Sequence, residues 1–326
     1  QVRAGVLYPR WFPEFAFGYG HPVLNFYGPL SYYWGLPFTL LGIDPALALK
    51  LVLAGGLIAS ALGMYVFARL HLGRGGAVAA ALVYAYQPYH QVDLYVRGAV
   101  AEFLAIVWFP VVLWAIHRLV AAPKTGRLPF AALAALLLTA LVATHSLSAL
   151  IFAPVLAIYL VIVLNQDHKR GALGGVALAL VLAAALGAFD WLPVFVESGY
   201  VGLGLGASGG YKNHLVGLAD LFSLRLTYPY PTESGTAPTF PLGLGQLAIL
   251  AASLVLTFGF RYRQWANLLF LGVALCSAFM LTLASRPLWQ LFEAGLAFLQ
   301  YPWRFQALLV LSTAFLGGAL VDAARR

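Results

Sequence analysis

The chain has 326 residues, of which 62% are hydrophobic and only 9% charged, and its mean hydropathy is +0.86. Soluble domains are about 45–50% apolar and about 25% charged, so this composition excludes an ordinary soluble domain. The net charge of +8 does not indicate a nucleic-acid partner, because eleven of the nineteen basic residues fall in predicted cytoplasmic loops, where anionic lipids attract them. We expect no nucleic acid to bind.

The first segment, residues 1–44, is predicted to be an extracytoplasmic loop. It is too rich in Pro, Gly and aromatic residues to form a clean span. Residues 30–42 are too few to cross a bilayer and predict an interfacial helix, because their tyrosines and tryptophan suit the headgroup level. A plain aromatic belt is the alternative. Since Gln1 begins in an outer loop, we expect an odd number of crossings upstream, most simply one.

Apolar stretches of helical length follow, and each crossing of a bilayer by a helix needs about 20 such residues. The sequence therefore predicts an all-α polytopic membrane protein with about nine transmembrane helices. The only cysteine, Cys276, lies inside one of them, so no internal disulfide can form, and we predict a small core residue. The predicted spans are 45–70, 75–88, 99–121, 128–144, 147–164, 171–194, 242–260, 265–284 and 304–323.

Charge placement predicts the orientation, because short cytoplasmic loops carry an excess of Lys and Arg. Basic pairs or groups occur on alternate loops, and the other loops carry nine of the eleven acidic residues. These acidic loops are predicted to be extracytoplasmic. They include a long loop at 195–241, interpreted as a lid over a site or as a disordered surface loop, and an outer-face segment at 285–303.

The main candidate site precedes and enters the span at 99–121. If this segment is helical, His90, Asp93 and Arg97 share one face by their spacing. A guanidinium there can hold a phosphate through two parallel hydrogen bonds, and a carboxylate can act as a base toward a hydroxyl. Glu102 enters the first turns of the span, where an ionisable group is costly. The alternative is an Asp93–Arg97 ion pair, with Glu102 favoured by the helix dipole.

Two further candidates lie at predicted outer ends of spans. His145, in a short turn, can accept a proton from an acceptor hydroxyl or bind a cation, unless it is merely hydrogen-bonded. Arg304 lies at the start of the last span, where a helix N-terminus disfavours a cation, so it calls for an anion or a carboxylate partner. Snorkelling to the headgroups is the alternative.

Another outer helix end carries Asp190 and Glu197. These carboxylates would lie near one face only if the helix continued past Pro193, which an interior proline disfavours. The structural interpretation is a capped and kinked helix end with an acid in water.

Several motifs resemble bacterial multi-pass proteins labelled 6-pyruvoyl-tetrahydropterin synthase-related membrane proteins, over nearly the whole chain. No part resembles a soluble pterin synthase. Those proteins are similar to class-C glycosyltransferases (the GT-C fold), a group that includes oligosaccharyltransferase catalytic subunits. The motifs are Gly5-Val6-Leu7-Tyr8-Pro9-Arg10-Trp11, Gly18-Tyr19-Gly20-His21-Pro22, Phe26-Tyr27-Gly28-Pro29-Leu30-Ser31-Tyr32-Tyr33, Arg97-Gly98-Ala99-Val100-Ala101-Glu102, Thr144-His145 and Pro302-Trp303-Arg304.

The resemblance implies a GT-C-like bundle in the cell (inner) membrane that moves a sugar from a polyprenyl-phosphate carrier to an acceptor glycan, lipid or protein on the extracytoplasmic face. Such enzymes carry their catalytic acid just after the first span, and Glu14 lies in the corresponding loop but past the usual place. The implied catalytic residues are Glu102, His145, Asp93 and Glu14, and the implied lipid-phosphate ligands are Arg97, Arg304 and Arg10.

The hypothetical mechanism has an acid of the first outer loop deprotonate the acceptor while Arg97 and Arg304 stabilise the leaving phosphate. No residue spacing requires a cofactor or metal, although the outer acids and histidines permit a divalent cation. A transporter is disfavoured because the span interiors carry almost no charge. A non-enzymatic structural subunit of a membrane assembly remains the alternative.

Overall fold

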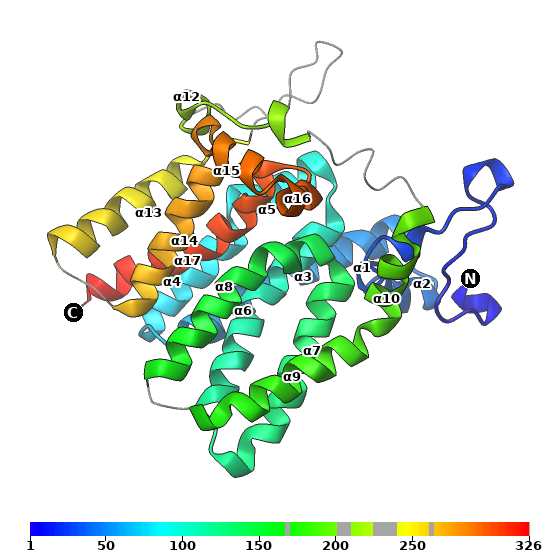
Figure 1. The fold of residues 1–326 in the computed structure, drawn as a ribbon, viewed down its shortest axis with the longest axis horizontal. Helices are drawn as coiled ribbons and strands as arrows, with labels where there is room; N and C mark the ends of the chain where they lie inside the picture. The colour runs from blue at the N-terminus through cyan, green and yellow to red at the C-terminus, as the bar shows by residue number, and fades with distance from the viewer. Residues whose placement is uncertain (167–169, 201–209, 224–239, 261–263, 326) are drawn as a thin grey trace.

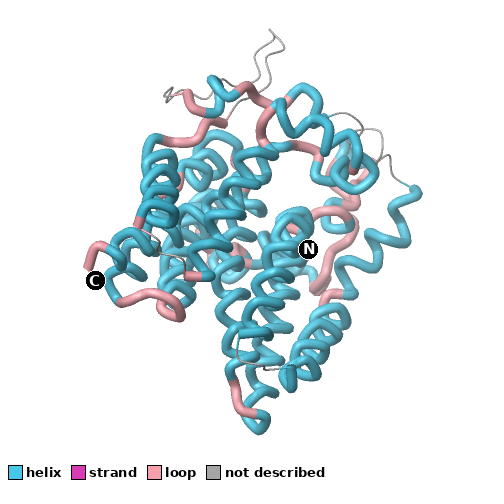
Figure 2. The backbone as a smooth tube through the Cα atoms, turned by 60° about the vertical axis from the view of Figure 1, so that its left-hand side comes forward, coloured by secondary structure: helices cyan, strands magenta, loops and turns pink. Residues whose placement is uncertain are grey.

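The computed structural model describes residues 1–166, 170–200, 210–223, 240–260 and 264–325. Within these ranges the chain is helical, and its β-pairing is limited to two isolated bridges, Phe12 with His21 and Val216 with Thr282. Figure 2 shows long helices joined by short loops. The all-α prediction is confirmed.

Five of the described helices are long and apolar enough to cross a membrane. Helices α9 (Leu173–Leu186) and α10 (Ala188–Glu197) make a sixth candidate if the bent pair counts as one span. These properties are those of a multi-pass membrane protein. The five are α3 (Pro45–Ala68), α6 (Val100–Ala121), α7 (Arg127–Thr144), α8 (Ser146–Gln166) and α17 (Gln306–Ala323).

The remaining three predicted spans are helical but short. They are α4 (Arg74–Ala85), α13 (Leu244–Leu254) with a π-helical continuation over Val255–Gly259, and α14 (Trp265–Met280). At 1.5 Å per residue, the twelve residues of α4 extend only about 18 Å, against a hydrocarbon core of about 30 Å. Described helices therefore occupy all nine predicted positions, and five or six of them reach crossing length.

Helices α6 and α17 form the centre of the bundle. In their most apolar windows 72% and 83% of the residues are buried, compared with 28% for α7 at the periphery. Helix α6 packs against α3 and α7, and α17 packs against α4 and α14 (Figure 1). A residue at the outer end of either central helix is therefore enclosed by its neighbours.

The basic loops gather at one end of the bundle. Arg127 Nη1 donates a hydrogen bond to the carbonyl of Gly171, which joins two of these loops, and the backbone N–H of Gly73 donates to Asp322 Oδ1 at 2.7 Å, which joins a third to the C-terminal end of α17. Figure 1 shows α12 (Leu218–Leu221), α15 (Arg286–Leu291) and α16 (Glu293–Leu296) together at the opposite end. We call this the acidic end.

The predicted interfacial helix at 30–42 consists of two short helices, α1 (Leu30–Tyr33) and α2 (Leu36–Leu40). Helix α2 lies beside α3, and α1 contacts α6 and α7. Residues 201–209 and 224–239 of the predicted lid at 195–241 lie outside the described residues. Of its described parts, 210–223 bonds through Val216 to the backbone of Leu281 and Leu283.

Two local predictions are wrong. Cys276 is exposed on the surface of α14 rather than packed in the core. Helix α10 continues through Pro193, and the chain bends by 65° at the preceding junction, where Gly187 separates α9 from α10. Pro193 is the sixth residue of α10, where another residue would donate its N–H to the carbonyl of Phe189, so the helix continues without this one bond.

Candidate functional site at the acidic end

A short irregular segment places Arg97 beside the start of α6. Helix α5 (Pro88–Gln91) continues as a π-helix over Val92–Arg97, and Gly98 ends it with a positive φ of 61°. This left-handed conformation is one that glycine adopts at little cost. The chain reverses there, so that Arg97 reaches Glu102 in the first turn of α6.

Arg97 is the centre of a buried hydrogen-bond network. Its Nη1 donates to Asp93 Oδ1 at 2.6 Å and to Tyr89 Oη at 2.8 Å, and its Nη2 donates to Glu102 Oε2 at 3.0 Å. The Tyr89 hydroxyl donates in turn to Glu102 Oε1 at 2.6 Å. The contact between Asp93 and Arg97 expected in the alternative interpretation is therefore present as a hydrogen bond, and Glu102 is part of the same network. We call Tyr89, Asp93, Arg97 and Glu102, with neighbouring Arg304, the arginine cluster.

The two carboxyls of the cluster are in different states. Burial, followed by the charge of Glu102, raises the pKa of Asp93 well above its usual value, and Arg97 lowers it by less. Asp93 Oδ2 is buried without a hydrogen-bond partner among the described residues. Both oxygens of Glu102 accept hydrogen bonds, as an ionised carboxylate does. The environment thus favours a protonated Asp93. The carboxylate of Glu102 is then the negative charge that faces Arg97 and Arg304.

Arg304 is the second arginine. It lies in a short helix, Pro302–Phe305, that leads into α17, and only 9% of its surface is exposed. Its Nη2 donates to Gln300 Oε1 at 2.9 Å, whereas its Nε and Nη1 are buried and lack hydrogen-bond partners among the described residues. Its charge acts on both Asp93 and Glu102, although no ion pair forms. A buried guanidinium whose donors lack partners among the described residues is energetically costly.

The residue before Arg304 links the two arginines. Trp303 is buried, stacks on Tyr301 with ring centroids 4.2 Å apart, and lies under the Arg97 guanidinium at 5.9 Å. His214 packs edge-on against the Trp303 ring at 4.5 Å. These aromatic contacts hold the 301–304 segment against the cluster and shield it from water.

His145 lies within electrostatic range of Glu102 and both arginines. Burial lowers its pKa to about 4, with Glu102 opposing this effect, so the ring is neutral. The backbone N–H of Ser148 donates to His145 Nδ1 at 3.2 Å, in the manner of an N-cap of α8. Since Nδ1 accepts, the ring hydrogen is on Nε2, and His145 can offer a hydrogen-bond donor there rather than a base.

A cavity of about 410 Å³ adjoins the cluster. Its wall includes Gly98, Val100 and Ala101, which lie between Arg97 and Glu102 in the sequence, and Tyr27 from the N-terminal segment. The Tyr27 phenol interacts electrostatically with Glu102, Arg304 and Arg97. The cavity therefore lies next to the segment that carries Arg97 and Glu102, and Tyr27 is the lining residue that interacts with the cluster.

Gly28 allows the N-terminal segment to approach this cavity. A Cβ atom at Gly28 would collide with the carbonyl oxygen of Thr144 at the end of α7. Only a glycine lets the backbone come this close. The close contact places Tyr27 at the cavity, on the side where α7 and α8 meet.

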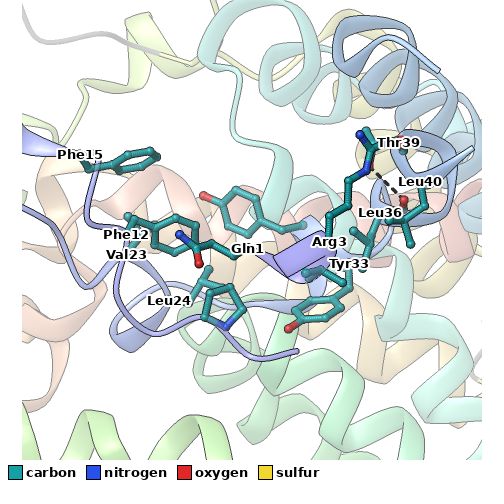
Figure 3. A pocket seen from close by; sticks show the side chains of 13 residues that line it. Gln1, Arg3, Phe12, Phe15, Val23, Leu24, Tyr33, Leu36, Thr39 and Leu40 are labelled. Atoms are coloured by element: carbon teal, nitrogen blue, oxygen red, sulfur yellow. Dashed lines mark hydrogen bonds between the residues drawn. The ribbon is translucent and has the colours of Figure 1, made fainter. Parts of the chain in front are cut away.

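A larger pocket, of about 560 Å³, lies elsewhere on the N-terminal segment. Figure 3 shows its mostly apolar lining, with Phe12, Phe15 and Leu24 on one side and Leu36 and Leu40 on the other. Its one charged side chain, Arg3, donates to the carbonyl of Thr39 at 2.5 Å. The smaller cavity is the stronger candidate because its wall includes Gly98, Val100 and Ala101, which adjoin Arg97 and Glu102 in the sequence.

The structure does not bring every predicted residue to the cluster. Arg10 donates to Glu197 Oε1 and to Asn25 Oδ1, both at 2.6 Å, and so ties the N-terminal segment to α10. Glu14 is exposed on the loop between Phe12 and His21. His90 points into the core, where its ring packs edge-on against Tyr84 and Phe103.

Two tyrosines of the site were not selected from the sequence. Tyr89 bridges Arg97 and Glu102, and Tyr27 lines the cavity. Both lie within segments singled out for other residues, but tyrosine is common at membrane interfaces, and its type alone does not separate a bridging residue from a belt residue.

Within the described residues, no group of three or more His, Cys, Asp or Glu side chains converges to hold a metal ion. The sequence matches no protein-family model, and no curated protein is significantly similar to it. The geometry of the arginine cluster is therefore the basis of the functional argument.

Proposed function

We propose that the protein is a membrane glycosyltransferase of the GT-C type, with nine crossings, that uses a polyprenyl-phosphate-linked sugar at the extracytoplasmic face of the cell membrane. The observation that carries the proposal is Arg304, whose Nε and Nη1 are buried and unpartnered among the described residues. A cation in this state costs stability unless an anion joins it, and a lipid phosphate at headgroup depth supplies one.

The two arginines have different roles because they differ in their charged partners. Arg97 is already neutralised by Glu102 and hydrogen-bonded to Asp93 and Tyr89. It therefore acts as a positioning residue that holds Glu102 and supports the wall of the cavity. Arg304 has free donors, and we assign to it the direct contact with the phosphate, where it stabilises charge that develops as the glycosidic bond to the phosphate breaks.

The remaining groups take supporting roles. His145 has an N–H donor at Nε2, because its Nδ1 accepts a hydrogen bond. The buried indole of Trp303 has an N–H without a partner among the described residues. The base that deprotonates the acceptor is a separate question: Glu102 has both oxygens engaged, and Asp93 is buried. We assign that role to an acid of the first outer loop, as the resemblance to class-C enzymes implies.

The first experiment replaces Arg304 in the full-length protein. We expect the parent, purified in mild detergent, to retain prenyl-phosphate lipids detectable by mass spectrometry and to bind farnesyl methyl phosphate. Arg304→Gln should weaken that binding about a hundredfold, the typical effect of removing one preorganised donor. Arg286→Gln, which removes an exposed arginine of the same end of the bundle, is the matched control and should bind as the parent does.

The midpoint of thermal unfolding of Arg304→Gln distinguishes a transferase from a structural subunit. If Arg304 serves a ligand, its removal relieves an unpaired buried charge, and Arg304→Gln should melt at the same temperature as the ligand-free parent or higher. A clear drop in the midpoint, together with bulk phospholipids alone in the parent, would identify Arg304 as structural and favour the non-enzymatic subunit.

A further inference from the structure

Three helices enclose a group of buried polar side chains that the proposed function does not use. Helix α17 packs against both α4 and α13 (Figure 1). Gln87, at the break between α4 and α5, and Gln246, in the first turn of α13, are each only 2% exposed. Gln87 Nε2 donates to Thr313 Oγ1 of α17 at 2.9 Å. Two side-chain amides therefore lie inside an apolar bundle, where polar groups are costly.

The packing of α13 on α17 places Gln246 opposite Thr313. The Ile249 side chain comes within 3.2 Å of the position that a Cβ atom on Gly317 would occupy, so the two helices touch there. Gln246 lies three residues before Ile249 on the same face of α13. Thr313 lies four residues before Gly317 on the same face of α17. Since both helices begin at the acidic end (Figure 1), Gln246 and Thr313 face each other one turn from that contact.

A second contact closes the space at the start of α13. A Cβ atom on Gly243, which precedes α13, would lie 2.7 Å from Cγ of Pro88, the residue after Gln87. Gln246 therefore lies between two tight contacts, with the break between α4 and α5 on one side and α17 on the other. The amide of Gln87, bonded to Thr313, borders the same enclosed space.

The two amides have more hydrogen-bonding atoms than the surrounding protein satisfies. Both Nε2 and Oε1 of Gln246 and Oε1 of Gln87 are buried, and none of the three has a hydrogen-bond partner in the described part of the chain. Buried polar atoms in proteins are nearly always paired, with the protein or with ordered water. A cation is disfavoured here, because the N–H groups of Gln246 and the N-terminal end of α13 carry positive partial charge. A ligand that both donates and accepts hydrogen bonds fits this set of atoms.

We infer that Gln87 and Gln246 hold ordered water between them, and that this water fastens the first turn of α13 to the break between α4 and α5. A water molecule can donate to both Oε1 atoms, or donate to Gln87 Oε1 while it accepts from Gln246 Nε2. The link bears on the arginine cluster, because Tyr89 follows Gln87 by two residues. It is independent of the proposed function, since neither amide contacts the groups assigned to the phosphate or the acceptor.

The first test is a structure of the full-length protein in lipid nanodiscs, at a resolution that reveals ordered water. We expect density within about 3 Å of Gln87 Oε1 and of the Gln246 amide. Two amides bonded directly to each other, or two separated amides with no density between them, would overturn the inference. This measurement needs no variant, so it does not depend on whether a substitution folds.

A cycle of two substitutions tests the same link through stability. Gln246→Met keeps the length of the side chain and removes both polar atoms. In the parent it should lower the midpoint of thermal unfolding by about 2 °C or more, because Gln87 Oε1 loses its bridged partner. In the Gln87→Met background it should raise the midpoint, since no partner is then left unpaired. A change of the same sign in both backgrounds overturns the link.

Ser253→Ala is the matched control. Ser253 lies seven residues after Gln246 on the same face of α13, and its Oγ is likewise buried without a partner in the ranges that the structure describes. A serine hydroxyl can turn to a carbonyl of its own helix, so its loss should shift the midpoint by less than about 1 °C in either background. A reversal of sign confined to Gln246→Met supports the bridge, whereas the same reversal in Ser253→Ala contradicts it.

Discussion

Two buried polar groups lie at opposite ends of the same apolar bundle, and they are built differently. At the basic end, Tyr159 Oη is hydrogen-bonded to His71 Nε2 at 3.0 Å and to His117 Nδ1 at 2.8 Å; we call these three residues the histidine cluster. Burial, followed by His117, lowers the pKa of His71 to about 3, so this ring is neutral. At the acidic end, the arginine cluster contains the charged Arg97, Glu102 and Arg304, and two donor atoms of Arg304 lack partners in the part of the chain that the structure describes.

The difference shows which polar group serves the fold and which serves a ligand. A neutral hydroxyl between two imidazoles, packed among Phe67, Trp265 and Phe315, connects α3, α6, α8, α14 and α17. It specifies packing at low electrostatic cost. Arg304, by contrast, makes one side-chain hydrogen bond within the described ranges, with a group that can make five, and it is retained in spite of that cost.

The largest effect on stability should come from breaking the arginine cluster. Glu102→Ala leaves Asp93 as the one carboxyl partner of Arg97. The two buried arginines then lack the negative charge of Glu102. Removing one partner of a buried pair costs about 3 kcal/mol of unfolding free energy or more. The midpoint of detergent-induced or thermal unfolding measures it. Glu293→Ala, which removes a half-exposed ion pair with Lys212, is the control and should cost less than about 1 kcal/mol.

A pH dependence should follow from His145. Because folding lowers its pKa from 6.5 to about 4, the unfolded chain takes up a proton first, and stability falls as pH decreases from about 6.5 toward 4. The unfolding free energy should fall by on the order of 3 kcal/mol in total over this pH range. His145→Asn keeps a capping side chain without a titratable group, so its thermal midpoint should fall less over this range. Parallel curves for parent and variant would contradict this prediction, since His71 and His90 titrate in both.

The histidine cluster gives the next smaller effect. Tyr159→Phe removes the bridging hydroxyl and should lower the unfolding free energy by about 1–2 kcal/mol, because two ring nitrogens lose a partner. Binding of farnesyl methyl phosphate should stay at the parent value. A loss of binding as large as that of Arg304→Gln would show that the two ends of the bundle are coupled, and the comparison between them would no longer separate fold from function.

The sequence predicts much of this architecture and part of the site. Apolar runs located described helices at the nine predicted positions, five or six of which are long enough to cross a membrane, and spacing alone indicated the contact of Asp93 with Arg97. Both are local properties of the sequence. The unused donors of Arg304 and the bridge from Tyr89 to Glu102 depend on how distant segments meet, so spacing does not determine them. Arg10 was assigned to the phosphate by resemblance, whereas its partners are Glu197 and Asn25, which only the fold reveals.

Cys276 marks the limit of that reasoning, and its substitution should have the smallest effect. In a helix such as α14 that is apolar all round, a face toward lipid and a face toward protein have the same composition, so the sequence cannot distinguish them. Cys276 is exposed, whereas Ala274, two residues earlier and on the other side of the helix, is completely buried. Cys276→Leu should therefore change the unfolding free energy by less than about 0.5 kcal/mol, whereas Ala274→Leu overpacks the bundle and should cost about 1–3 kcal/mol. Equal thermal midpoints for the two variants would mean that α14 is rotated relative to the present structure, and the faces assigned to the helices around the arginine cluster would have to be redrawn with it.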